Sequence, residues 1–111
     1  MTISTGKRRS ERLILDVPLV IRGQAADQQT FQEQNTTLIV NAHGALLMLE
    51  TKVAPGQKLL LVNPKNRDER EATVAHVKES YGGLSRVGVE FTRPAPEFWS
   101  ISSPPADWNL T

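Results

Sequence analysis

Hydrophobic residues alternate with polar ones along most of the chain, and this period of two predicts β-strands rather than helices. The first such segment, residues 13–22, places five apolar side chains on one face: Leu13, Leu15, Val17, Leu19 and Ile21. The opposite face is mixed and includes Pro18, which has no N–H to donate to a neighbouring strand. We therefore expect this strand to lie at a sheet edge or to contain a bulge.

Five further segments alternate in the same way and are separated by turns that contain glycine or proline. They predict strands at residues 31–40, 44–50, 57–63, 70–80 and 86–91. In the fifth strand, strict alternation places Ala72, Val74 and His76 on one side, which indicates that His76 is a residue of the sheet rather than a catalyst. In the last strand, Val87, Val89 and Phe91 share one face and are expected in the core with Leu13, Leu15 and Val17. Six short strands predict an all-β fold, a small antiparallel barrel or sandwich, over residues 13–92.

Two segments flank this predicted domain. Residues 1–12 form a basic N-terminal arm that we expect to be flexible, because it has no apolar anchor beyond Ile3. Residues 93–111 form a proline-rich tail with room for one helical turn in PEFWSI. We expect the tail to pack on the barrel, with Phe98 or Trp99 closing one end, because exposure of such large rings wastes apolar burial.

Composition excludes several classes of function. A chain of 111 residues, 39% of them hydrophobic, is long enough for one domain with its own core. The absence of cysteine excludes disulfides and thiolate metal sites, and two histidines are too few for a metal centre. No apolar run is long enough to span a membrane and no signal peptide is indicated, so we expect a cytoplasmic protein. Without a P-loop or a nucleophile beside a base, we expect neither an enzyme nor a cofactor.

The chain is nearly neutral, but its charges are unevenly distributed. Thirteen Lys and Arg against twelve Asp and Glu give a net charge of +1, too little to attract duplex DNA. The segment KRRSER, residues 7–12, nevertheless gathers four cations around one glutamate just before the first strand. Such a cluster is typical either of a solvated tail or of a local phosphate-binding site.

The order of these features resembles the PilZ domain family. RRSER at residues 8–12 matches the R-x-x-x-R motif that precedes the family's first strand, and RVGVEF at residues 86–91 matches its closing strand. The resemblance extends over residues 7–92. It implies a six-stranded antiparallel PilZ-type β-barrel that binds the bacterial second messenger cyclic di-GMP. By this resemblance Arg8 and Arg12 clamp the ligand, with Arg9 as a helper.

The second motif of the family, D/N-x-S-x-x-G, is altered in this chain. If Gly44 is its glycine, Ile39 replaces the acidic or amide residue and Asn41 replaces the serine. A register that starts at Asn41 fits less well, because it places His43 at the serine and Leu46 at the glycine. Asn41 can donate and accept hydrogen bonds, and His43 can stack on a base or contact a phosphate. Alternatively, Asn41 and His43 serve only the turn before Gly44.

Two functions therefore stay open. The first is a cyclic di-GMP receptor that signals through an unidentified effector protein. Its six candidate ligand-binding residues are Arg8, Arg9, Arg12, Asn41, His43 and Gly44. The second is a PilZ-like adaptor that does not bind cyclic di-GMP and acts only by protein interaction. RRSER favours the first, which we prefer, and the changes at Ile39 and Asn41 favour the second. A binder of single-stranded nucleic acid is a third alternative, but 5% aromatic residues leave few platforms for stacking bases.

Overall fold

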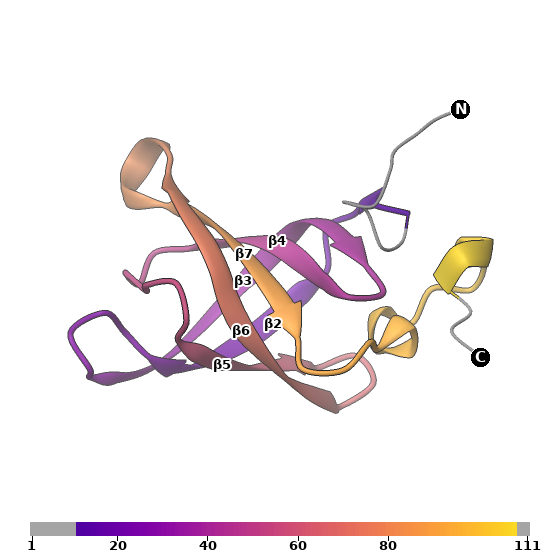
Figure 1. Cartoon of the computed structure of the whole chain (residues 1–111), viewed down its shortest axis with the longest axis horizontal. Coiled ribbons are helices and arrows are strands. Elements are labelled where there is room, and N and C mark those ends of the chain that lie inside the picture. Colours follow the sequence, from indigo (N-terminus) through magenta and orange to yellow (C-terminus); the bar gives the residue numbers. More distant parts are fainter. Residues whose placement is uncertain (1–10, 109–111) are drawn as a thin grey trace.

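The computed structural model describes residues 11–108 and shows a closed six-stranded antiparallel barrel with one short additional strand (Figure 1). The strands are β1 Leu13–Ile14, β2 Pro18–Gln24, β3 Thr30–Asn41, β4 Gly44–Leu49, β5 Lys58–Asn63, β6 Asp68–Glu79 and β7 Ser85–Phe91. Three 3₁₀ turns complete the described chain: η1 Tyr81–Gly83, η2 Pro96–Trp99 and η3 Ala106–Trp108. The predicted fold class is confirmed. Of the arm expected to be flexible, residues 1–12, the first ten lie outside the described residues, whereas Glu11 has both backbone groups hydrogen-bonded.

The barrel closes because the long strand β3 pairs with different strands along its length. Its first half pairs with β2 from Gln24↔Thr30 to Pro18↔Thr36, and its second half pairs with β4 up to Asn41↔Gly44. The sheet then continues from β2 through β5, β6 and β7 back to β4. The short strand β1 pairs with the same end of β3 that contacts β4. Residues 11 and 12, which precede β1, therefore lead into the barrel beside the β3–β4 hairpin.

The segment predicted as one strand at residues 13–22 is two strands with a break before Pro18. The side chain of Thr37 on β3 fills this break. Its hydroxyl donates to the carbonyl of Leu15 at 2.6 Å and accepts from the N–H of Val17 at 2.9 Å. Pro18 then begins β2, a position at which its missing N–H does no harm. The expectation of a sheet edge or a bulge is not met, because β2 pairs with β3 on one side and with β5 on the other, and the chain instead breaks before Pro18.

The expected core is present, with one difference in the first segment. Leu19 and Ile21 are fully buried, whereas Leu13, Leu15 and Val17 are only half-buried and pack against the margin of the core. The residues predicted from the last strand, Val87, Val89 and Phe91, are all buried.

A bulge at Ala75 divides β6 into two parts with opposite faces. The pairing with β7 passes from Val74↔Val89 directly to His76↔Gly88, so Ala75 is skipped. Val74 is buried, but beyond the bulge Val77 packs toward the core and His76 is exposed. The predicted alternation, which placed His76 on the face of Val74, is therefore wrong after residue 74.

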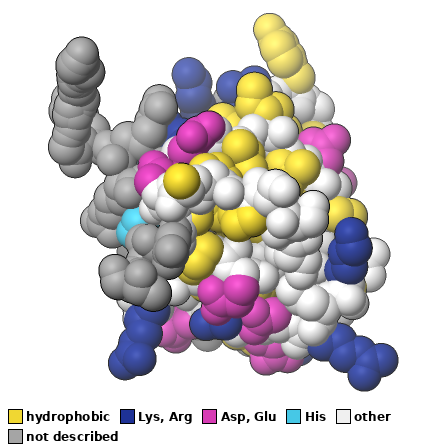
Figure 2. Space-filling view, turned by 90° about the vertical axis from the view of Figure 1, so that its right-hand side faces the viewer, with side chains coloured by type: hydrophobic (Ala, Val, Ile, Leu, Met, Phe, Trp, Pro, Cys, Tyr) yellow, Lys and Arg dark blue, Asp and Glu magenta, His cyan; other side chains and the backbone are white. Residues whose placement is uncertain are grey.

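The tail contributes large side chains to the core. Phe98 and Trp99 of η2 are buried, and the ring centroid of Phe98 lies 5.4 Å from that of Phe91 and 5.0 Å from that of Trp99. Both contacts are edge-to-face, the arrangement that aromatic quadrupoles favour. Trp108 of η3 is also buried. Figure 2 views the end of the molecule where this tail packs, and apolar side chains occupy the centre of that face.

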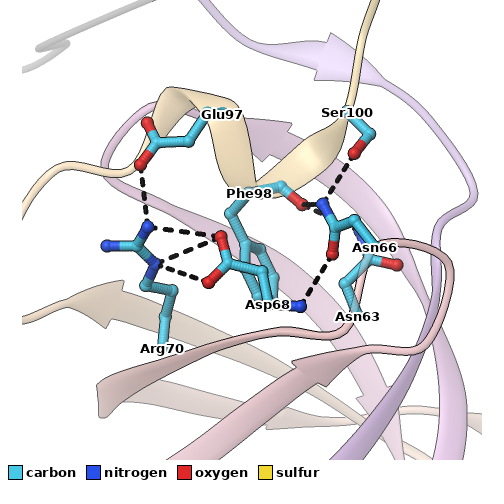
Figure 3. A network of polar contacts seen from close by, with 7 residues as sticks. All are labelled: Asn63, Asn66, Asp68, Arg70, Glu97, Phe98 and Ser100. Atoms are coloured by element: carbon cyan, nitrogen blue, oxygen red, sulfur yellow. Dashed lines mark hydrogen bonds and ion pairs between the residues drawn. The ribbon is translucent and has the colours of Figure 1, made fainter.

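Polar contacts fasten η2 to the β5–β6 hairpin (Figure 3). The buried side chain of Asn63 donates its Nδ2 to the carbonyl of Phe98 at 2.8 Å, and Asn66 donates to Ser100 Oγ at 2.6 Å. On the other side of the turn, Arg70 bridges Asp68 at 3.2 Å and Glu97 at 2.8 Å. The start of the tail is thus held by ring packing and by hydrogen bonds together.

The carboxylate of Glu33 holds the loop that follows β4. Its oxygens accept hydrogen bonds from the N–H groups of Glu50 and Thr51, from the Thr51 hydroxyl and from Asn35 Nδ2. Partial burial acts to raise the pKa of Glu33, but these donors outweigh it and hold the pKa below its ordinary value. The ionised form therefore binds this loop more strongly than the protonated form.

We expect Glu33→Gln to lower the free energy of unfolding by about 1–2 kcal/mol at neutral pH, because charge-assisted hydrogen bonds are lost. Since the folded-state pKa is depressed, the stabilisation is present above the unfolded-state pKa and is lost as the pH falls through the folded-state pKa. Urea denaturation of both proteins as a function of pH tests this. The prediction is contradicted if the difference in unfolding free energy between the unmodified protein and Glu33→Gln does not become smaller at acidic pH.

Gly44 allows β4 and β7 to approach each other. A Cβ at this position would lie 2.0 Å from the carbonyl oxygen of Val89, which belongs to backbone and cannot turn away. A Cβ at Gly23 would meet the end of the Leu59 side chain at 2.7 Å, and the nearest backbone atom, the carbonyl oxygen of Lys58, would lie 3.0 Å away. The direct role of Gly44 is therefore to close the barrel.

We expect Gly44→Ala to cost stability at the upper end of the about 1–3 kcal/mol that overpacking costs, since strand backbone must move. Gly23→Ala is the matched comparison, and its cost should be smaller. Denaturation midpoints measure both. If Gly44→Ala loses no more stability than Gly23→Ala, the close approach of β4 and β7 does not require glycine at position 44.

Candidate functional site

A pocket of about 350 Å³ opens on the outside of the barrel, where the β3–β4 hairpin meets the middle of β6 and β7. Its volume is within the range of small-molecule sites. It is lined by Arg12, Ile39, Val40, Asn41, His43, Gly44, Ala45, Leu46, Ala75, His76, Gly88, Val89 and Glu90. Glycine and alanine at four of these positions leave the barrel wall hollow here.

The structure brings four of the six predicted ligand-binding residues to this pocket. Arg12 comes from the chain just before β1, and Asn41, His43 and Gly44 come from the β3–β4 hairpin. The other two, Arg8 and Arg9, lie outside the described residues. The two motifs quoted from the sequence therefore meet at one pocket. In the sequence, 28 residues lie between Arg12 and Asn41, where the hairpin turn begins.

Asn41 stabilises the turn with one end of its side chain. Its Oδ1 accepts a hydrogen bond from the N–H of His43 at 2.9 Å, which is an Asx turn. The alternative role expected for Asn41, turn chemistry, is therefore real. Within residues 11–108 its Nδ2 donates to no other group, so two N–H donors remain for a bound molecule.

Three consecutive carbonyls of this hairpin turn accept hydrogen bonds from the chain that begins at the end of β7. The N–H of Phe91 donates to His43, the N–H of Ala95 donates to Ala42, and Trp99 Nε1 donates to Asn41, each at 2.8 Å. The turn is therefore held by segments about 50 residues away in sequence, and the pocket wall that it forms is fixed.

The imidazole of His76 lies flat against the backbone of Gly88. A Cβ on Gly88 would be only 2.2 Å from His76 Nε2 and 2.5 Å from its Cε1, so a larger residue there would displace the ring from this position. His76 is exposed and lines the pocket, which presents a flat ring to a bound molecule. The sequence did contain a signal for this position, because the apolar spacing of Val74 and Val77 is three rather than two.

The pocket carries both signs of charge. Arg12 supplies a guanidinium, and Glu90, which pairs with Gly44 across β4 and β7, supplies a carboxylate. Ile39, at the position where the family motif has a carboxylate or an amide, contributes only apolar surface. Glu90 was not predicted from the sequence, because its place beside the hairpin depends on how the barrel closes.

The described residues support neither a metal site nor a membrane-spanning helix. Residues 11–108 contain no group of three or more His, Cys, Asp or Glu side chains placed to hold a metal ion. In the same part of the chain, no helix has the length and apolar character needed to cross a membrane.

Comparison with known proteins agrees with the geometry. No curated protein matches the chain. The family model described as PilZ domain matches residues 6–98, a range that includes the arginine cluster, the whole barrel and the turn η2 up to Phe98. The chain belongs to the PilZ domain family.

Proposed function

We propose that this PilZ domain binds cyclic di-GMP in the pocket beside the β3–β4 hairpin and signals through contact with an effector protein. PilZ domains form a family of cyclic di-GMP receptors and adaptors rather than of enzymes. The observation that carries the proposal is the position of Arg12. This last arginine of the R-x-x-x-R motif lines the same pocket as Asn41 and Gly44 of the second motif.

The chemistry of the ligand suits an arginine at this place. Cyclic di-GMP presents two phosphates and two guanines, and a guanidinium pairs with phosphate oxygens or with guanine O6 and N7 in a planar fork. In the proposed complex Arg12 makes such a contact from the pocket wall. Arg8 and Arg9, from the preceding residues of the arm, complete the clamp on the other phosphate or guanine.

Other pocket residues can replace the contacts that the altered second motif has lost. The carboxylate of Glu90 is an acceptor for the N1–H and N2–H of a guanine, in place of the acidic or amide residue absent at Ile39. Asn41 Nδ2 is a donor for a phosphate or for guanine O6. The ring of His76 is a stacking surface for a base. His43 lines the pocket next to these groups.

The adaptor without ligand is the second candidate, and three observations favour it. Ile39 places an apolar side chain in the pocket wall, and the Oδ1 of Asn41 is already used by the N–H of His43. In addition, the carboxylate of Glu90 repels phosphates unless a guanine edge covers it. In this case the barrel serves as a platform for a protein partner.

We expect calorimetric titration to show binding of cyclic di-GMP that weakens at least about tenfold in Arg12→Ala, because a charge-assisted hydrogen bond is lost. Arg22→Ala is the matched control, since Arg22 is an exposed arginine on β2 that donates to Gln32 and does not line the pocket. Both variants should melt within about 2 °C of the unmodified protein. No heat at ligand concentrations on the order of hundreds of micromolar would reject the receptor in favour of the adaptor.

We also expect His76→Ala to weaken binding about tenfold, as removal of one stacking platform does. Lys78→Ala, an exposed substitution two residues further along β6, should leave the affinity unchanged. Titration with cyclic di-AMP, which has the same phosphates and different bases, measures how much of the affinity comes from the guanines. An unchanged affinity in His76→Ala would exclude the stacking role.

A further inference from the structure

The C-terminal turn η3 contacts the base of the N-terminal arm. Trp108 Nε1 donates to the carbonyl of Glu11 at 2.7 Å, and the N–H of Glu11 donates to Asp107 Oδ2 at 2.8 Å. The Trp108 side chain is only 1% exposed, so its indole is anchored in the core while its N–H reaches the arm. Both backbone polar groups of Glu11 are thus bound by two adjacent residues of the tail.

This contact acts on the pocket through the next residue in the chain. Glu11 immediately precedes Arg12, which lines the pocket, and β1 begins at Leu13. Arg12 is therefore fixed on one side by the pairing of β1 with β3 and on the other by the grip of η3 on Glu11. Because β1 has only two residues, the hydrogen bonds from η3 add to the hold on this part of the chain.

The tail holds the opposite pocket wall by the same kind of contact. Trp99 Nε1 donates to the carbonyl of Asn41 at 2.8 Å, as Trp108 Nε1 does to that of Glu11. One continuous segment, residues 96–108, therefore contacts both motifs that face the pocket. One of its two indole groups binds the carbonyl of Glu11, and the other binds the carbonyl of Asn41.

We propose that η3 is a clamp on the arginine arm, with Trp108 and Asp107 as positioning residues for Arg12, and that clamping and cyclic di-GMP binding strengthen each other. The proposal rests on the proposed function for its ligand. The coupling is required to be reciprocal: if the clamped tail raises the affinity for the ligand, the ligand tightens the tail by the same factor. A partner protein that contacts the tail could then detect whether the pocket holds a ligand.

The test uses the full chain with two substitutions that loosen the clamp. Trp108→Phe keeps a ring in the core and removes the N–H donor, and Asp107→Ala removes the acceptor at an exposed position. Glu97→Gln is the matched control, because it breaks the ion pair of η2 with Arg70 and, within residues 11–108, Glu97 has no polar contact with Glu11 or Arg12. If Trp108→Phe folds poorly, Asp107→Ala still tests the clamp.

Two measurements are made on each protein. Amide hydrogen exchange by NMR, at Glu11 in the free protein, reports on the clamp directly, and we expect it to be at least about tenfold faster in both clamp variants. Calorimetric titration with cyclic di-GMP should show affinity reduced about tenfold, which corresponds to the loss of one hydrogen bond. In Glu97→Gln both quantities should be unchanged. In the unmodified protein, saturating ligand should slow exchange of the Trp108 indole N–H.

The outcomes separate this inference from the proposed function. Unchanged exchange at Glu11 in the clamp variants would show that η3 does not hold the arm. Faster exchange with unchanged affinity would show that the grip does not position Arg12. If the unmodified protein does not bind cyclic di-GMP, the proposed function is wrong and the coupling with it, whereas exchange at Glu11 alone still decides whether the clamp exists.

Discussion

The structure depends on how the turn between β3 and β4 is held. Ala42, at its tip, is fully buried, and a buried carbonyl needs a hydrogen-bond partner. The donors come from Phe91, Ala95 and Trp99, at the end of β7 and beyond. This segment also places Phe98 in the core. Its detachment would therefore expose the Phe98 ring to water and leave carbonyls of the hairpin without their hydrogen-bond donors. Residues 95–99 therefore help to hold the barrel together, although they add no strand to it.

The same closure creates the pocket, and each hollow in its wall has a local cause. Gly44 lets β4 pair closely with β7, and Gly88 leaves space for the ring of His76. The bulge at Ala75 turns His76 outward, which is a common use of bulges beside functional sites. A pocket on the outer wall of a barrel is therefore formed without any gap in the sheet.

The strands could be predicted from the sequence because each has one buried face, which fixes its alternation. The closing strand was expected at residues 86–91 and is observed at Ser85–Phe91. The break before Pro18 could not be foreseen in the same way, because it is filled by Thr37, from a strand 20 residues away. The position of His76 likewise depends on its pairing with Gly88, which alternation within one strand does not reveal.

The candidate site was predictable where a motif marked it and not elsewhere. Asn41 and Gly44 were found through a motif, and both line the pocket. Glu90 sits in an ordinary strand pattern, and only barrel closure places its carboxylate opposite Gly44. The contact between Glu11 and Trp108 joins residues 97 positions apart and involves a backbone carbonyl, which leaves no trace in the sequence pattern.

The pocket's polar groups are spread over four segments, and this bears on how a small domain can signal. A ligand that contacts Arg12, Asn41, His76 and Glu90 joins the arm, the hairpin, β6 and β7. Three of these segments belong to a closed barrel whose backbone hydrogen bonds resist movement. The arm is different, because beyond the two residues of β1 the described contacts that hold it come from the tail. If the proposed function holds, a ligand that contacts Arg12 acts next to the place where Glu11 meets η3, and we propose that an effector detects the ligand there.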